Sequence, residues 1–214
     1  MLEQLAFPAS QLDQIVRLGQ IRQLEPQQIL GRPADLYKSC YSFIGSGSLR
    51  SYRICPDGTE GIIQFTKEKG WIITPPASPD EGSIPVITKA LEETWLIQWT
   101  ADDIEQLRIE IPLFSRFLWQ LSNLQLSEAE NRIYADISHD ARGKYDCLLH
   151  SFPDVINRVP QYMIAAYLGV TRKTIGRIRN ELAGRCRSAE TRTFRIKPPI
   201  EHLIPQRNVL YTVR

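Results

Sequence analysis

The sequence predicts an α+β fold in three parts: an N-terminal double-stranded β-helix (jelly roll), one long helix, and a C-terminal pair of short helices around a tight turn. Residues 40–99 contain short segments rich in β-forming residues, separated by turns with Gly and Pro, which is typical of a β-sandwich. Residues 112–137 contain no Gly and no Pro after the first position. Residues 160–180 carry apolar residues at helical spacing on both sides of Gly169. We therefore expect domains at 1–111, 112–137 and 138–214.

The N-terminal part is expected to begin with a helix over residues 10–18, with Ser10 as its N-cap. Gly45-Ser46-Gly47 and Pro56-Asp57-Gly58 have the composition of turns between strands. Runs rich in Val, Ile, Thr and aromatic residues predict strands at residues 40–44, 48–54, 61–65, 71–74, 84–88 and 94–99.

The helical middle of the chain is expected to contain a short helix over residues 102–108 and a long one from Pro112 to about Ile137. The long helix can either pack on its own β-domain or pair with a second copy of the chain. Its apolar stripe is broad and long enough for both, so we expect both. A further helix is expected to begin at Ser138 and to end before Pro153. The stripe comprises Phe114, Phe117, Leu118, Leu121 and Leu124, continued with a shift by Leu126, Ala129, Ile133 and Ile137.

The segment from Pro160 to Asn180 predicts two helices around a reversal at Gly169, because glycine adopts a positive φ at little cost. Thr171 can cap the second helix through its hydroxyl. A hairpin that only packs on protein would share the apolar spacing, but it would not need three cations on the outward face. The layout is that of a helix-turn-helix, whose second helix enters the DNA major groove. We expect DNA contacts from Gln161, Thr171, Arg172, Lys173, Thr174, Arg177, Arg179 and Asn180.

Charge is distributed unevenly along the chain. The net charge is +2, but residues 141–214 hold 14 Lys and Arg against 5 Asp and Glu, a balance of +9. Residues 1–140 hold 12 Lys and Arg against 19 Asp and Glu, a balance of −7. A basic C-terminal part joined to an acidic N-terminal part is expected of a DNA-binding domain attached to a domain that avoids DNA.

Several other classes of protein are not supported. His139, His150 and His202 all lie outside the β-rich part, and no nucleophile elbow, P-loop or dinucleotide-binding motif is present, so we expect no enzyme and no metal. Neither a secretory leader nor an apolar run near the roughly 18 residues of a membrane span is evident, so we expect a cytoplasmic protein. Well-separated cysteines predict reduced thiols at Cys40, Cys55, Cys147 and Cys186.

The run RVPQYMIAAYLGVTRKTIGRIR, residues 158–179, resembles the helix-turn-helix of the Crp/Fnr family of bacterial transcription regulators. The resemblance extends more loosely over residues 10–182, where Phe43, Gly47, Arg50, Asp57-Gly58 and Gly70, and then Ala90 to Thr94, follow the order of the family's effector domain. It implies a cyclic-nucleotide-binding-like domain, a dimerisation helix and a winged helix-turn-helix. It also implies double-stranded DNA, a second copy of the chain and RNA polymerase as partners. The dimer contacts that it implies are Phe114, Phe117, Leu118, Leu121, Leu124, Leu126 and Ile133.

The wing and the effector are less evident. Residues 193–197 can form one strand of a wing, and residues 198–214 are not assigned. Relatives that sense cyclic nucleotides hold the cyclic phosphate with an Arg, whereas residues 70–88 contain no Arg or Lys and include Asp80 and Glu81, which repel an anion. The cysteine cluster of iron–sulfur relatives is also missing, since no Cys precedes Cys40. We expect no cofactor, and the effector remains unknown. An aromatic ligand pocket and plain core packing are both compatible with Trp71, Trp95 and Trp99, and core packing is favoured.

The function expected from these observations is that of a homodimeric, sequence-specific DNA-binding transcription regulator that does not depend on cyclic nucleotides. One alternative is a regulator of the same fold that responds to a cyclic nucleotide or another small ligand. The other is a β-roll ligand-binding or signalling module whose helical tail packs on a partner protein and does not bind DNA. The balance of +9 in residues 141–214 argues against this last alternative.

Overall fold

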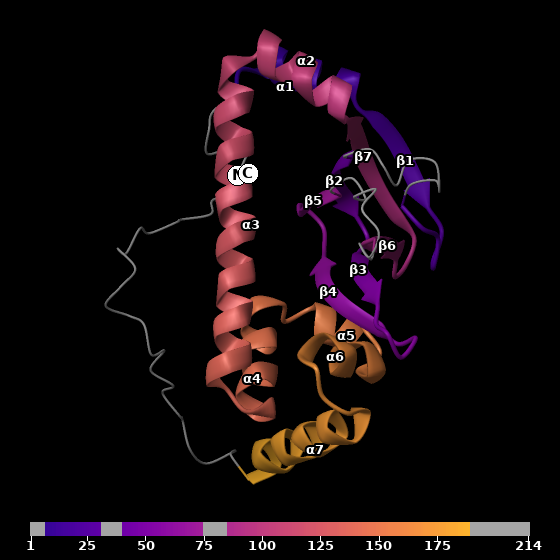
Figure 1. Cartoon of the computed structure of the whole chain (residues 1–214), viewed down its shortest axis with the longest axis vertical. Helices are drawn as coiled ribbons and strands as arrows, with labels where there is room; N and C mark the ends of the chain where they lie inside the picture. Colours follow the sequence, from indigo (N-terminus) through magenta and orange to yellow (C-terminus); the bar gives the residue numbers. More distant parts are fainter. Residues whose placement is uncertain (1–6, 31–39, 75–84, 189–214) are drawn as a thin grey trace, which may run out of the picture. The chain divides into compact units, whose positions relative to one another are not determined.

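The computed structural model describes residues 7–30, 40–74 and 85–188 (Figure 1). The chain divides into two compact units, Met1–Gly176 and Arg177–Arg214. The strands are β1 (Gln20–Leu24), β2 (Cys40–Ser46), β3 (Leu49–Ile54), β4 (Glu60–Thr66), β5 (Trp71–Thr74), β6 (Ile87–Ala90) and β7 (Thr94–Thr100). The helices are α1 (Ala9–Leu18), α2 (Ala101–Glu110), α3 (Pro112–Ser138), α4 (Ala141–Ser151), α5 (Val155–Arg158), α6 (Gln161–Leu168) and α7 (Arg172–Ser188).

The strands form two antiparallel sheets, one with the order β1-β7-β2-β5 and one with the order β4-β3-β6. Alternate residues of both sheets meet in one apolar core, so the sheets pack face to face. The four-stranded sheet contributes Leu24, Ile44, Ile72 and Leu96 to this core, and the three-stranded sheet contributes Leu49 and Ala90. The expected α+β architecture with packed antiparallel sheets is therefore present.

Two strands differ from the prediction. Strand β1 was not expected, and its alternation is weak because only Leu24 is buried. Strand β6 covers Ile87–Ala90, whereas a strand was predicted over 84–88. Its pairing with β3, from Leu49↔Ala90 to Tyr52↔Ile87, decides where it lies, and a pairing partner is not visible in local sequence.

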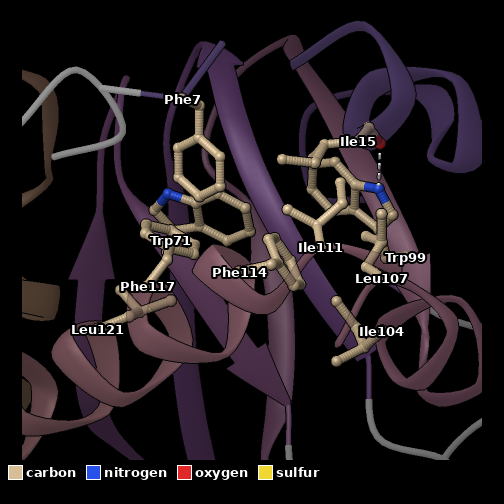
Figure 2. Packing of buried hydrophobic residues seen from close by; sticks show 10 residues of the cluster. All are labelled: Phe7, Ile15, Trp71, Trp99, Ile104, Leu107, Ile111, Phe114, Phe117 and Leu121. Atoms are coloured by element: carbon tan, nitrogen blue, oxygen red, sulfur yellow. Dashed lines mark hydrogen bonds between the residues drawn. The ribbon is translucent and has the colours of Figure 1, made fainter. Parts of the chain in front are cut away.

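The other face of the four-stranded sheet is covered by α1, α2 and the first part of α3 (Figure 2). Trp71 and Trp99 stack there with ring centroids 5.3 Å apart, and the indole N–H of Trp99 donates to the Ile15 carbonyl at 2.8 Å. Core packing is thus confirmed for these two tryptophans. Trp95, by contrast, is 44% exposed and donates to the Glu93 carboxylate.

The predicted helices are present, with corrections at their ends. The long helix α3 begins at Pro112, where the missing N–H costs nothing, and it ends at Ser138. Ser138 does not start the following helix: its hydroxyl donates back to the Tyr134 carbonyl, and the Asp140 side chain caps α4 by accepting from Gly143 N–H at 2.8 Å. Ser10 does not cap α1 either, because that helix already begins after Pro8.

Candidate nucleic-acid interface

The helix α6 and the turn after it follow the predicted pattern. Ile164, Ala165 and Leu168 are buried. Gly169 adopts the left-handed conformation, with φ 65° and ψ 32°, and its N–H bonds to the Ala165 carbonyl. Val170 N–H bonds to the same carbonyl at 3.0 Å. A glycine is needed here because a side chain disfavours this φ, so the reversal between α6 and α7 is fixed by local sequence.

The N-terminus of α7 is closed by Thr171, as predicted. Its hydroxyl oxygen accepts from Thr174 N–H at 3.1 Å and forms a hydrogen bond with the Thr174 hydroxyl at 2.8 Å. This cap satisfies one of the N–H groups that a helix leaves unpaired at its start. Arg172 therefore begins the helix at a defined rotation, which determines the faces of the residues that follow.

The two faces of α7 differ sharply. Ile175 and Ile178 are buried, at 0% and 2% exposure. At 100° per residue, Lys173, Arg177 and Asn180 lie on the opposite face, and all three are exposed. The exposed face of this helix is thus cationic and able to donate hydrogen bonds to phosphate or to guanine.

The remaining predicted DNA contacts have various surroundings. Arg172 and Thr171 are exposed beside the cationic face, whereas Gln161, Thr174 and Arg179 are partly buried. The Nε of Arg177 lies 3.9 Å from a carboxylate oxygen of Glu181, one helical turn further on, and the Arg177 side chain is 73% exposed. This weak pair leaves the guanidinium available for contact with another molecule. The predicted wing strand at 193–197 lies outside the described residues.

The predicted dimer contacts fall into two groups. Phe114, Phe117 and Leu121 are buried in the chain's own core, and Leu118 packs against that core (Figure 2). On another face of α3 lies what we call the outer stripe: Trp119, Leu126, Ile133 and Ile137, which are 68%, 58%, 59% and 82% exposed. Leu124 is also exposed but lies on a different side of the helix. The apolar stripe predicted from the sequence included Ile137 but left out Trp119, although the spacing of seven between 119, 126 and 133 was visible.

The region between β5 and β6, where a cyclic phosphate would be bound in relatives, is described only up to Thr74 and again from Pro85. The cassette expectations for Asp80 and Glu81 therefore lie outside the described residues. Within the described β-domain, Arg50 is a buried cation, and it is paired with Glu60. In the described part of the chain no group of three or more His, Cys, Asp or Glu is placed to hold a metal ion, and no helix has the length and apolarity to cross a membrane.

No protein-family model matches this sequence, and no curated protein sequence matches it. Solved structures do match. FixK2 from Bradyrhizobium japonicum superposes with a TM-score of 0.65 at 17% identity, over 78% of this chain and 86% of that one. The c-di-GMP responsive global regulator CLP of Xanthomonas campestris superposes with a TM-score of 0.62 at 17% identity, over 84% of this chain and 93% of that one. A transcriptional regulator from Eubacterium rectale, described as a member of the Crp/Fnr family, superposes with a TM-score of 0.61 at 14% identity, over 84% of this chain and 85% of that one.

These neighbours define the class of fold. They include a Crp/Fnr transcription regulator, and the expected resemblance to that family is confirmed at the level of the fold. At identities of 14–17% the likeness establishes the architecture, while the chemistry of each site must be argued from this chain's own residues.

Proposed function

We propose that this chain is a sequence-specific DNA-binding transcription regulator. The observation that carries the proposal is the exposed cationic face of α7, the helix that follows the left-handed Gly169 and is capped by Thr171 two residues later. In this proposal α6 and α7 form a helix-turn-helix, and Lys173, Arg177 and Asn180 face the major groove. Residues 1–111 then act as a jelly-roll effector domain, 112–137 as a dimerisation helix and 138–214 as the DNA-binding domain.

The same proposal includes a homodimer formed through the outer stripe of α3. Trp119, Leu126 and Ile133 recur every seven residues, which is the repeat that keeps one seam of a helix against a partner helix. Ser122 and Ala129, small residues between them, permit a close approach of two helices. Exposed apolar side chains in such a row are typical of an interaction surface. A dimer would place two recognition helices about 34 Å apart, one helical turn of DNA.

We further propose that regulation does not use cyclic nucleotides. A buried cyclic phosphate requires a cationic partner, since an unpaired buried charge is costly. Arg50 already donates from both Nη atoms to the Glu60 carboxylate, and residues 70–88 supply neither Arg nor Lys. The effector domain would then respond to another ligand, or the protein would act without one.

The test is retention of fragmented genomic DNA by the purified protein, followed by sequencing of the retained fragments. We expect an enriched motif with two-fold symmetry. The double variant Arg172→Ala/Lys173→Ala should lose enrichment. The charge-matched control Arg108→Ala/Arg116→Ala, which changes two exposed cations on α2 and α3, should retain it. A wild-type protein that enriches no DNA would favour the β-roll signalling module instead.

A further inference from the structure

The arginine at position 132 of α3 is held by backbone carbonyls of two other elements. Its Nη2 donates to the Ile62 carbonyl at 2.9 Å and to the Tyr167 carbonyl at 3.0 Å, and its Nη1 donates to the Ile63 carbonyl. Ile62 and Ile63 belong to β4, and Tyr167 lies in the last turn of α6. One guanidinium therefore joins the long helix, the three-stranded sheet and the helix that precedes the turn at Gly169.

Both kinds of acceptor are available for a physical reason. The β3–β4 register passes from Ser51↔Gln64 to Tyr52↔Ile62, so Ile63 is the extra residue of a β-bulge, where the ladder is locally interrupted. The Tyr167 carbonyl is one of the last carbonyls of α6, which have no partner inside the helix. A cation is also favoured at this end of a helix by the helix dipole.

Aromatic packing reinforces the same junction. The Arg132 guanidinium lies 4.2 Å from the centroid of the Tyr167 ring, and that ring lies 5.2 Å from the ring of Phe65 on β4. Burial raises the pKa of Tyr167, which is consistent with a phenol ring enclosed between these elements. The helix α6 thus contacts β4 directly, as Figure 1 also shows.

A second arginine is placed just before the other end of α6. The Nη1 and Nη2 atoms of Arg158 donate to the two carboxylate oxygens of Glu68 at 3.1 and 2.9 Å, and Nη2 also donates to Glu92. Glu92 in turn accepts from the buried Ser48 hydroxyl at 2.6 Å. Glu68 follows β4 and Glu92 precedes β7, so both carboxylates lie in turns of the β-domain. The hydrogen bonds between Arg158 and Glu68 raise the pKa of the first and lower that of the second.

We infer that Arg132 and Arg158 form a two-point clamp that holds α6 against the β-domain, so that the β-domain controls the position of α6 and of the turn that follows it. Two changes in the β-domain would release the helix. One is a rearrangement of the bulge at Ile63, which would withdraw a carbonyl from Arg132. The other is neutralisation of Glu68 and Glu92, which would free Arg158. The clamp is a coupling device inside one chain, and it does not require that the chain bind DNA.

The experiment is hydrogen exchange on the full chain, followed at the amides of Met163–Leu168. We expect the double variant Arg132→Met/Arg158→Gln to accelerate exchange there by roughly tenfold or more, while the sheet core around Ile44 and Leu96 exchanges as in the wild type. Arg116→Gln, an exposed arginine on the same helix α3, is the matched control and should change nothing. Wild-type protection of α6 in the double variant would overturn the inference.

A second experiment tests whether changes in the β-domain affect α6, with variants that leave the sequences of α3 and α6 intact. Glu68→Gln/Glu92→Gln keeps side-chain volume in two partly exposed turns, so folding should be preserved. We expect it to accelerate exchange in α6, and adding Arg158→Gln should produce little further change because all three act through one network. Additive effects, or no effect on α6, would show that the turns do not control the helix. DNA retention is measured separately, so failure of the clamp and failure of the proposed function can be told apart.

Discussion

Lys173 carries an ammonium group that can only donate hydrogen bonds, so it is expected to favour guanine O6 and N7 or a phosphate. Arg172, in the first turn of α7, is our choice for a bidentate contact to guanine. Arg172→Ala should weaken binding by roughly 1–3 kcal/mol and relax preference at one base step, as measured by site selection and titration. A pure phosphate contact would instead weaken all sequences alike and reduce the salt slope by about one.

Lys173→Glu should shift preference towards cytosine at its step, since a carboxylate accepts from cytosine N4, and should weaken binding generally. Selection of an unchanged motif by this variant would show that Lys173 contacts the backbone of DNA and not a base. The alternative for both residues is a phosphate contact, which adds affinity without sequence information.

Gly176 lies within α7 between Lys173 and Arg177, and apart from its chain neighbours and the adjacent backbone of α7 itself no described atom lies within 4 Å of the position that a Cβ would occupy. Packing within the chain therefore gives no reason for a glycine that costs a helix about 0.5–1 kcal/mol relative to alanine. We expect Gly176→Ala to stabilise the protein by up to that amount and to weaken DNA binding, because the backbone could no longer approach DNA as closely. Calorimetric unfolding and DNA titration measure the two effects, and stabilisation with unchanged DNA affinity would contradict a close approach.

The helix α3 has one face buried in the chain's own core and another, the outer stripe, that would pair with a second copy in the proposed dimer. Leu121→Glu would place a charge in the chain's own core, where Leu121 is 3% exposed, so this change would test folding and not dimerisation. Leu126→Glu/Ile133→Glu changes only the outer stripe. We expect this variant to fold and to be monomeric by light scattering at micromolar concentration, with much weaker DNA binding.

The control for that prediction is Ile109→Glu, which changes an exposed apolar residue on α2 away from the outer stripe and should leave the dimer intact. A wild-type protein that is monomeric at micromolar concentration yet binds DNA tightly would contradict the homodimer.

The clamp at Arg158 predicts a pH dependence for the whole molecule. Glu68 and Glu92 both pair with Arg158, and the neighbouring Lys67 pairs with Asp154 at 3.5 Å. The hydrogen bond from Arg158 lowers the pKa of Glu68 below its ordinary 4.5. The stabilisation that the pair of Glu68 and Arg158 contributes is therefore fully present above that ordinary value, and it is lost as the pH falls through the lowered pKa.

The measurement is the difference in Tm between the wild type and Glu68→Gln. Because the pair is partly exposed, we expect about 1 kcal/mol or less, equivalent to at most roughly 2–4 °C, at neutral pH. The difference should vanish in acid, where Glu68 is protonated and resembles Gln. Glu105→Gln, which breaks an exposed pair with Arg108, should change Tm little at any pH. A difference that persists below the lowered pKa of Glu68 would argue against the ion pair as its cause.

Calorimetry tests whether the protein binds cyclic nucleotides. We expect neither cyclic AMP nor cyclic GMP to bind, because Arg50 already pairs with Glu60 and residues 70–88 offer no cation. Micromolar affinity for either nucleotide would contradict this prediction and would favour the cyclic-nucleotide-responsive regulator.

Local sequence determined much of this protein. Short-range rules sufficed for the long helix from Pro112, for the left-handed turn at Gly169 and for the cap at Thr171, because each depends on the conformational preference of one residue and its nearest neighbours. The inward face of Ile175 and Ile178 followed from helical periodicity in the same way.

Tertiary structure alone decided which apolar face of α3 remains exposed, because periodicity identifies an apolar stripe but not its partner. The sheet and α2 bury Phe114 and Leu121, while Leu126 on the outer stripe stays exposed. The position of β6 and the Arg132 clamp are likewise non-local. The clamp joins residues 35 and 70 positions apart in sequence, through a bulge carbonyl and a helix-end carbonyl that become available only when the sheet and α6 have formed.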